Sequence, residues 1–352
     1  MYQGPSVMAE VKALLQSRVG DLVRELAPDG RQHLGYWIAR CPWRDDKHAG
    51  SFYVWLGSLG KTPGAWRDDA TGEKGDIVDL ICKARNLDRR QALSWARRWL
   101  NYETLPAPAR KAELEAYARR RAEREREAAD ELEQNKRRAF AVFVRSKQVN
   151  FISTLAHTYL LSRSIDVTLL PRMPGCLGFL PASRHPESGQ EWPAMVAGFS
   201  RDDGRIEAVH RTFLARDGSG KAPIEPVRKI WPSFKGLAVR LWRGESGLSV
   251  KEACKHGLLE TLAIVEGVED GLSVAMARPD LRVWCAGSLA NIGELEIPHC
   301  CDRVIVCADN DWGKPQAERL LNAGLQRLAR QGRQVLVARS PVGKDMNDAI
   351  RG

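Results

Sequence analysis

Acidic residues follow three short apolar runs in the C-terminal third of this chain. Glu266 comes directly after residues 262–265, Asp309 and Asp311 follow residues 304–308, and Asp345 and Asp348 come after residues 335–337. In an open α/β sheet, ligands bind outside the carboxyl ends of the strands. Carboxylates that meet there repel one another unless a hard cation neutralises them, and Mg²⁺ or Mn²⁺ suits such oxygen ligands. A cation held in this way can clamp a phosphate during phosphoryl transfer.

Each of these acids also has an ordinary explanation. A Glu-Gly pair after a strand is often a turn with a solvated acid, and Asp309 alone could cap the next helix. The specific signal is the ordered set: a strand and Glu-Gly, a strand and Asp-x-Asp, then Lys-Asp-Met-Asn-Asp at residues 344–348. The set predicts one metal site formed by Glu266, Asp309, Asp311, Asp345 and Asp348.

The acids need a sheet that brings its strand ends together. Within residues 246–352, short apolar runs stand at 262–265, 283–286, 304–307 and 335–337, and helical stretches follow the first and third. This alternation predicts an α/β fold with a mostly parallel sheet flanked by helices. Residues 147–245 form a separate β-rich part, with strands expected at 192–200, 206–214 and 237–242.

The N-terminal part has a different character. Residues 1–103 read as a small α+β module, with a helix over 7–26, strands over 36–39 and 51–56, and a helix capped by Asp76. Residues 104–146 read as a charged helical linker dense in Ala, Glu and Arg. The linker could be a spacer or a basic surface for nucleic acid, and its mixture of both charge signs favours the spacer.

Composition limits the partners. The net charge of +10 favours a polyanionic partner, because Lys and Arg release counterions from phosphates, although a basic protein need not bind one. We find no apolar run of eighteen residues and no secretory signal, so we expect no membrane contact. Eight Cys without a C-x-x-C pair indicate a reduced, cytoplasmic protein.

The acidic set resembles the Toprim domain of bacterial-type primases, topoisomerases and some nucleases. Residues 265–270 (Val-Glu-Gly-Val-Glu-Asp) look like its first motif, in which the Glu, here Glu266, is the catalytic acid; Asp270 matches a further acid of that motif. Residues 309–311 look like its metal-binding Asp-x-Asp, and residues 344–348 look like the ending found in phage and mobile-element proteins. The resemblance covers residues 258–350 and implies catalytic roles for Glu266, Asp309, Asp311 and Asp345.

The preceding region is similar to the strand pair that opens a primase catalytic core, at residues 195–199, 204–206 and 210–212. That resemblance implies basic side chains that hold template or nucleotide phosphates, although an ordinary basic strand face would look the same. The candidates are Arg211, Lys221, Arg228, Lys229, Lys235 and, beside the acids, Lys344. Residues 218–221 (Gly-Ser-Gly-Lys) lack the rest of a Walker A motif, so any helicase would be a separate partner.

Residues 41–44, 50–54 and 75–80 follow the outline of a primase zinc-binding domain. Arg44 stands near the expected His, residues 66–70 contain no Cys, and His48 and Cys82 are poorly spaced beside Cys41. Structural zinc needs four ligands, so we expect a degenerate zinc-ribbon-like module without zinc. An aromatic core would replace the metal, or some of its rings would stack on single-stranded bases; the rings are those of Trp43, Phe52, Tyr53, Trp55 and Trp66.

Together these resemblances favour a DNA primase of a phage or mobile element, which would make short RNA primers from NTPs on single-stranded DNA with Mg²⁺ or Mn²⁺. Two alternatives remain open. A Toprim nuclease would use the same acids to hydrolyse a phosphodiester. A replication accessory protein would bind nucleic acid and keep the acidic site only as a relic.

Overall fold

The computed structural model describes residues 6–33, 35–57, 61–310 and 313–351. The chain divides into two compact units, Met1–Asp130 and Glu131–Gly352, and the division falls within one helix, α5 (Ala107–Ser146). Asp311, predicted as a metal ligand, lies outside the described residues. None of the helices in the described ranges is long and apolar enough to cross a membrane.

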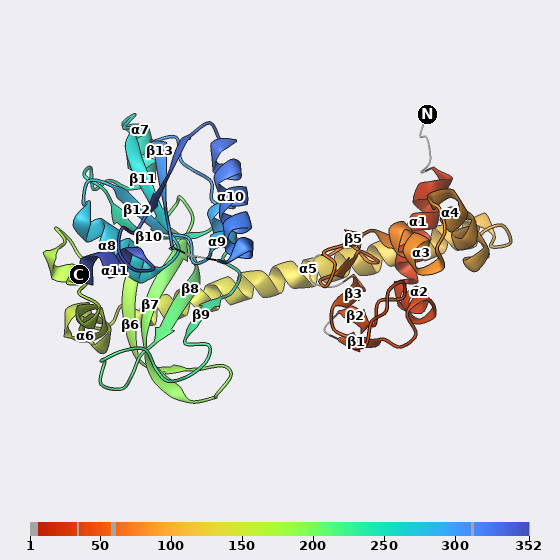
Figure 1. The fold of residues 1–352 in the computed structure, drawn as a ribbon, viewed down its shortest axis with the longest axis horizontal. Coiled ribbons are helices and arrows are strands. Elements are labelled where there is room, and N and C mark those ends of the chain that lie inside the picture. The colour runs from red at the N-terminus through yellow and green to blue at the C-terminus, as the bar shows by residue number, and fades with distance from the viewer. Residues whose placement is uncertain (1–5, 34, 58–60, 311–312, 352) are drawn as a thin grey trace. The chain divides into compact units, whose positions relative to one another are not determined.

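The N-terminal unit combines helices with a five-stranded antiparallel sheet in the order β1-β2-β3-β4-β5 (Figure 1). Its strands are β1 (Arg31–His33), β2 (Tyr36–Ala39), β3 (Phe52–Trp55), β4 (Trp66–Asp68) and β5 (Lys74–Gly75); its helices are α1 (Val7–Ser17), α2 (Val19–Leu26), α3 (Ile77–Arg85) and α4 (Arg89–Trp99). The single helix expected over residues 7–26 is wrong, because the chain breaks at Arg18. Asp76 caps α3 as predicted, accepting hydrogen bonds from the backbone N–H groups of Val78 and Asp79.

Helix α5 lies within residues 104–146, which were expected to form a charged helical linker. Near its start, Arg110 pairs with Glu10, and Glu113 accepts from Arg18 at 2.6 Å, so this end packs on the N-terminal unit. Near its other end, Ala139 and Ser146 are buried in the C-terminal unit. Between them the charged side chains face solvent, as the mixed charge pattern indicates.

The C-terminal unit is built on a nine-stranded sheet with the order β14-β13-β11-β12-β10-β7-β8-β9, and β6 pairs with β7. Strands β11 to β14 are parallel, which confirms the predicted α/β fold, and the remaining strands are antiparallel. The strands are β6 (Leu177–Arg184), β7 (Glu191–Ser200), β8 (Ile206–Phe213), β9 (Arg228–Trp231), β10 (Ala238–Arg243), β11 (Glu260–Val265), β12 (Arg282–Cys285), β13 (Cys301–Ala308) and β14 (Gln334–Arg339). Strands β6 and β9 were not predicted.

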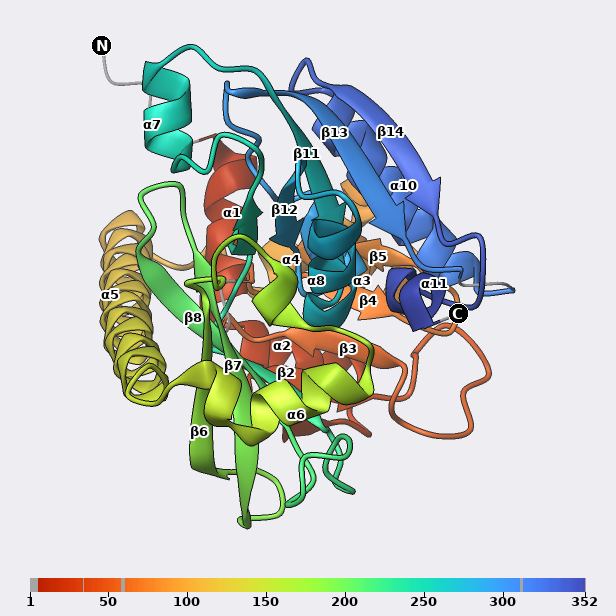
Figure 2. The same ribbon diagram turned by 90° about the vertical axis from the view of Figure 1, so that its left-hand side faces the viewer.

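Helices cover both faces of the parallel part of this sheet (Figure 2). The α-helices of this unit after α5 are α6 (Leu155–Ser162), α7 (Val250–Lys255), α8 (Val268–Ala277), α9 (Leu289–Ile292), α10 (Pro315–Ala329) and α11 (Met346–Arg351), with short 3-10 turns η1 (Phe151–Ser153) and η2 (Val167–Leu169). Residues of α8 pack on one face, and residues of α9 and α10 pack on the other.

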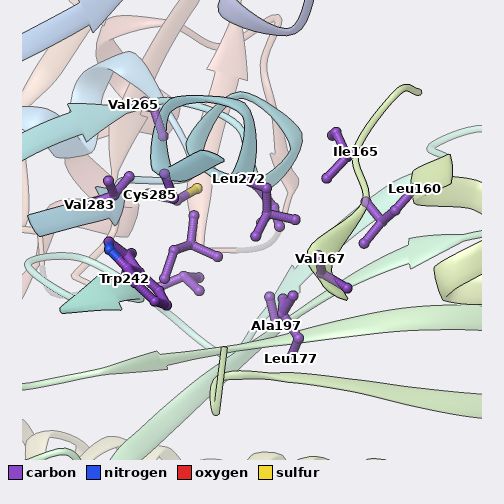
Figure 3. Packing of buried hydrophobic residues seen from close by; sticks show 14 of the residues in the cluster. Leu160, Ile165, Val167, Leu177, Ala197, Trp242, Val265, Leu272, Val283 and Cys285 are labelled. Carbon is purple, nitrogen blue, oxygen red and sulfur yellow. The ribbon is translucent and has the colours of Figure 1, made fainter. Parts of the chain in front are cut away.

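The two faces of strand β11 pack into different hydrophobic clusters. Ala263 and Val265 face the cluster that contains Leu272 of α8, whereas Leu262 and Ile264 face the opposite cluster. Figure 3 shows part of the first cluster, in which Val265, Val283, Cys285 and Leu272 lie together and Leu160, Ile165, Val167, Leu177 and Ala197 extend it toward β6 and β7. A strand buried on both faces reads as a continuous apolar run, as β11 does in the sequence.

Candidate functional site at the acidic edge of the sheet

Parallel register brings the predicted acids to one edge of the sheet. Val265, the last residue of β11, pairs with Cys307 of the neighbouring strand β13. Glu266 follows Val265 by one residue and Asp309 follows Cys307 by two, so both acids come at the ends of adjacent strands. Ala308 pairs with Arg339 at the end of β14, after which the chain turns through residues 340–345 to α11. The ends of three strands therefore present Glu266, Asp309 and Asp345 on the same side.

Asp270, on the first turn of α8, shows that these carboxyl groups converge. Burial raises its pKa, and the negative charges of Asp345 and Asp309 raise it further, to about 7. The backbone N–H of Asn347 donates to Asp270 Oδ1 at 3.1 Å and opposes the shift only in part. Such mutual repulsion is what a bound divalent cation would relieve, so the donor set fits a hard metal ion.

The loop that carries Asp345 is held by its own backbone. Asp345 Oδ1 accepts a hydrogen bond from the N–H of Asp348 at 3.0 Å. Asp348 Oδ2 accepts from the N–H of Lys344 at 2.7 Å, and this bond keeps the pKa of Asp348 below its usual value. Gly343 has φ +67°, and a Cβ there would lie 2.5 Å from the Asp348 carboxylate. Asp348 thus folds the turn that presents Asp345.

Asn310 joins this loop to the end of β13. Its side-chain amide donates to the carbonyls of Ser340 at 2.9 Å and Gly343 at 3.0 Å, and its backbone N–H donates to the carbonyl of Lys344. Sequence reasoning treated this residue as the unspecified middle of Asp-x-Asp. Asn310 therefore bonds three carbonyls of this loop, two through its side chain and one through its backbone, and ties the loop before Asp345 to the end of β13.

Lys344 is the predicted cation nearest to the acids. Its Nζ lies 3.7 Å from Asp309 Oδ2, and its side chain is 56% exposed whereas that of Asp309 is 19% exposed. In the residues that the structure describes, no group of three or more His, Cys, Asp or Glu side chains is arranged so that it could hold a metal ion. Asp311, the second acid of the Asp-x-Asp motif, is not among those residues.

Glu269 has an environment opposite to that of its neighbour Asp270. Glu269 is 4% exposed, and its Oε1 accepts from the Tyr159 hydroxyl at 2.7 Å and lies 3.1 Å from Lys221 Nζ. Burial favours the neutral acid, but the Lys221 charge and the Tyr159 hydrogen bond outweigh it and lower the pKa of Glu269 to about 2. Glu269 is a charged group that this fold neutralises internally.

Lys221 was predicted as a phosphate contact, and the structure pairs it with Glu269 across 48 residues of sequence. His210 lies in the same buried region. Burial lowers the pKa of His210 to about 4 against the opposing effect of the Glu269 charge, so this imidazole is neutral at pH 7. Nothing in the spacing of these residues revealed the cluster of Tyr159, His210, Lys221 and Glu269.

The other predicted basic residues lie at several places on the antiparallel strands. Arg211 on β8 donates to the carbonyl of Arg184 at 3.2 Å, and burial lowers its pKa. Lys229 pairs with Glu187, and Lys235 lies 3.2 Å from Glu294. Arg228 on β9 is exposed, and none of the described carboxylates lies within ion-pair distance of it. Arg228 is therefore the most available of the predicted phosphate contacts.

In the N-terminal unit an ion pair occupies the position expected for a zinc ligand. Arg44 donates to Asp68, which has no exposed surface, at 2.7 Å and lies 3.0 Å from Asp46. The backbone N–H of Cys41 donates to the same Asp46. The Arg44 interaction lowers the pKa of Asp68 against the effect of burial. The loop after β2 and strand β4, where zinc ligands would be expected, are thus joined by a guanidinium and a buried carboxylate.

The predicted aromatic core is only partly correct. Trp43 packs edge-on against Phe52 at 5.1 Å and Trp66 at 4.9 Å, and the last two are buried. Tyr53 and Trp55 do not belong to this core, because side chains alternate along β3 and these two rings point to the other face. They lie 5.0 Å apart and half-exposed.

Two parts of the chain match known domain families. Residues 261–352 match the model of the Toprim domain, and residues 133–241 match a domain of unknown function, DUF7146. No protein of curated function matches the chain. Similar solved structures include the zinc-binding and RNA polymerase domains of the Aquifex aeolicus primase, at 15% identity over 97% of this chain and 82% of that chain with a TM-score of 0.40. The E. coli primase catalytic core gives 18% identity over 62% and 75%, with a TM-score of 0.39.

Proposed function

We propose, from the Toprim domain that residues 261–352 form, that this chain is a DNA primase, which joins NTPs into short RNA primers on single-stranded DNA. The observation that carries the proposal is the gathering of Asp270, Asp309 and Asp345, which raises the pKa of Asp270 to about 7. Carboxyl groups that repel one another in this way form a site for a divalent cation beside a phosphate.

The residues divide the chemistry between them. Glu266, Asp309 and Asp345 would hold Mg²⁺ or Mn²⁺, with Asp311 as a further ligand expected from sequence. The bound ion would act as a Lewis acid and neutralise charge on the nucleotide phosphates. Glu266 would stand near the 3′-hydroxyl that attacks the α-phosphate, and Lys344 would contact the departing pyrophosphate. The protein contributes mainly position and charge, as in other phosphoryl transfers.

The β-rich part would place the template. Tyr159 and Lys221 hold Glu269 of α8, so the loop between β8 and β9 is fastened to the helix that carries Asp270. Arg228, at the start of β9, is exposed, its charge acts on His210 of this cluster, and it would contact a strand phosphate. Removing it would weaken DNA binding similarly for all sequences, since phosphate contacts carry no base information.

In the N-terminal unit, the outer face of the sheet carries a row of rings. His33 lies 5.5 Å from Tyr36, Tyr36 lies 5.9 Å from Tyr53, and Tyr53 lies 5.0 Å from Trp55. The Lys61 ammonium stands 5.7 Å from the Trp55 ring. Half-exposed rings beside a cation suit stacking with single-stranded bases, so we assign this face to the template as well. A phage or mobile-element origin and a separate helicase remain expectations from the resemblance.

Primer synthesis tests the proposal directly. Full-length protein is incubated with single-stranded DNA, labelled NTPs and Mg²⁺, and the products are separated by length. Asp309→Ala should lower the yield of short RNA by at least about a hundredfold, because a preorganised charge in the site is lost. Asp302→Ala is the matched control, since Asp302 is an exposed acid at the opposite end of the same strand. Equal synthesis by Asp309→Ala and the control would refute the assignment.

The same preparation separates the two alternatives. A nuclease would cut labelled DNA with Mg²⁺ in the absence of NTPs, and Asp309→Ala would abolish that cutting. An accessory protein with a relic site would bind single-stranded DNA but would take up no Mn²⁺ above background in a titration. A primase binds Mn²⁺ and needs NTPs to give a labelled product.

A further inference from the structure

A cavity of about 420 Å³ lies in the C-terminal unit away from the acidic edge. Arg243 at the end of β10 pairs with Arg282 at the start of β12, and Arg282 pairs with Leu262 near the start of β11. The acids follow the other end of β11. Four residues of strand separate Leu262 from Glu266, which is roughly 13 Å at 3.3 Å per residue. In Figure 1, α7 lies at the end of the sheet opposite α8 and α11.

Five cationic side chains from separate segments line this cavity. They are Arg172 after η2, Arg240 and Arg243 of β10, Lys251 of α7 and Arg282 of β12. Only two acids, Asp202 and Asp203, belong to the same lining. The cavity wall therefore carries a net positive charge within a concave space.

Two of the five cations already have acidic partners. Arg282 is 2% exposed and donates to Glu260 Oε2 from Nε at 2.9 Å and from Nη2 at 2.5 Å. Arg240 pairs with Asp202. Among the described residues, no carboxylate lies within ion-pair distance of Arg172, Arg243 or Lys251. Three positive charges are thus available to an anion from outside.

Two guanidinium groups of this cavity, those of Arg172 and Arg240, are held in position by packing. The Arg172 guanidinium lies 5.4 Å from the centroid of the Trp242 ring and against Gly247, where a Cβ would come within 2.0 Å of Nη2. The Arg240 guanidinium lies 4.3 Å from the Trp284 ring, and its buried Nε has no hydrogen-bond partner. Guanidinium groups fixed on indole rings lose little freedom when they bind phosphate oxygens, to which their planar donors are matched.

We propose that this cavity binds a compact polyphosphate anion, such as the triphosphate group of a nucleotide, at a site separate from the acidic edge. The volume falls within the usual range of small-ligand pockets. A triphosphate carries several negative charges in a short length, which matches three unpaired cations that converge from different segments. A single-stranded DNA backbone spreads its charges along an extended path and would meet only part of this set.

Binding without metal separates this site from the acidic edge. Isothermal titration of the full-length protein uses sodium tripolyphosphate, ATP and a single-stranded oligonucleotide, all with EDTA at one ionic strength. The acids repel phosphate when no cation is present, so heat from tripolyphosphate and ATP reports on the basic cavity. We expect both to bind and to compete with each other, and the oligonucleotide to leave their affinity unchanged.

The variants remove exposed cations and leave the buried pairs intact. Arg172→Ala combined with Arg243→Ala should weaken tripolyphosphate binding about tenfold for each guanidinium removed. Lys251→Glu gives a second variant at an exposed helix position, and it should weaken binding as well. Arg138→Ala is the matched control, because Arg138 is an exposed arginine of the same unit outside the cavity. Circular dichroism confirms the fold of each variant.

Two results would overturn the proposal. Tripolyphosphate affinity that is equal in the double variant, in Lys251→Glu and in the Arg138→Ala control would overturn the proposal. Displacement of tripolyphosphate by the oligonucleotide at equal phosphate concentration would also overturn it, in favour of a nucleic-acid surface. The test does not depend on primer synthesis: Asp309→Ala should bind tripolyphosphate in EDTA as the unaltered protein does, whether or not the chain is a primase.

Discussion

The ion pair between Lys221 and Glu269 should make a large contribution to the stability of the C-terminal unit. Glu269 is buried and charged, with Lys221 and Tyr159 as its partners. Lys221→Met removes the positive charge and leaves the carboxylate with one hydrogen bond. Breaking a buried pair costs about 3–5 kcal/mol. The lower end applies here, because the Lys221 side chain is 33% exposed and solvent screens part of its charge.

The lowered pKa of Glu269 determines how the stability of the C-terminal unit changes with pH. The pKa of Glu269 is lowered from 4.5 to about 2, so the folded state binds this proton less tightly than the unfolded chain. This difference in pKa corresponds to about 3 kcal/mol of folding stability. The contribution is fully present above pH 4.5 and is lost as pH falls from 4.5 toward 2. In Lys221→Met, burial dominates and raises the pKa of Glu269. That variant should therefore lose stability as pH rises above about 4.5.

Urea unfolding of the C-terminal unit at pH 4 and pH 7 measures both effects, with hydrogen exchange in residues 260–277 identifying the unit that unfolds. The double variant Lys221→Met with Glu269→Gln should regain about 2 kcal/mol relative to the sum of the single changes, because no charge stays buried. Lys255→Met removes an exposed lysine at the end of α7 and should change little. A Lys221→Met variant within 0.5 kcal/mol of this control at pH 7 would refute the reasoning.

Three further predictions concern other sites. Arg44→Met should lower the Tm of the N-terminal unit in calorimetry, because Asp68 keeps its buried charge without a partner, whereas Lys74→Met should not. Mn²⁺ affinity, followed by titration, should increase from pH 6 to pH 8 as Asp270, with its pKa of about 7, loses its proton; Asp270→Asn should bind more weakly and flatten this dependence. Trp55→Ala should weaken binding of a fluorescent single-stranded oligonucleotide about tenfold, the value of one stacked base, and unchanged binding would exclude this ring from the interface.

The acidic edge could be predicted from sequence because its geometry is local. Strands β11 and β13 are apolar on both faces, and acids that follow them directly must emerge at the carboxyl edge once the strands are parallel. The break at Arg18 was not predictable in this way. The apolar pattern continues from α1 into α2, and Arg18 leaves the helix where it donates to Glu113, which is 95 residues away.

The partners of the basic residues were beyond the reach of sequence for the same reason. Lys221 and Glu269 meet only because the loop after β8 folds over α8, and no periodicity connects them. Likewise, the spacing of residues 344–348 predicted Asp348 as a metal ligand but did not reveal that its carboxylate accepts a hydrogen bond from the N–H of Lys344. Strand ends can be located from a pattern, whereas the direction of a polar side chain depends on contacts that the pattern does not contain.

Glu269 and Asp270 show how the fold separates a structural acid from one that awaits a cation. They are adjacent on the first turn of α8, yet the pKa of Glu269 is about 2 and that of Asp270 about 7. Lys221 and Tyr159 supply Glu269 with a charge and a donor, whereas Asp270 faces the acids Asp345 and Asp309. A protein that needed only stability could place a second lysine beside Asp270. The repulsion that raises the pKa of Asp270 is explained if an external cation completes the acidic edge.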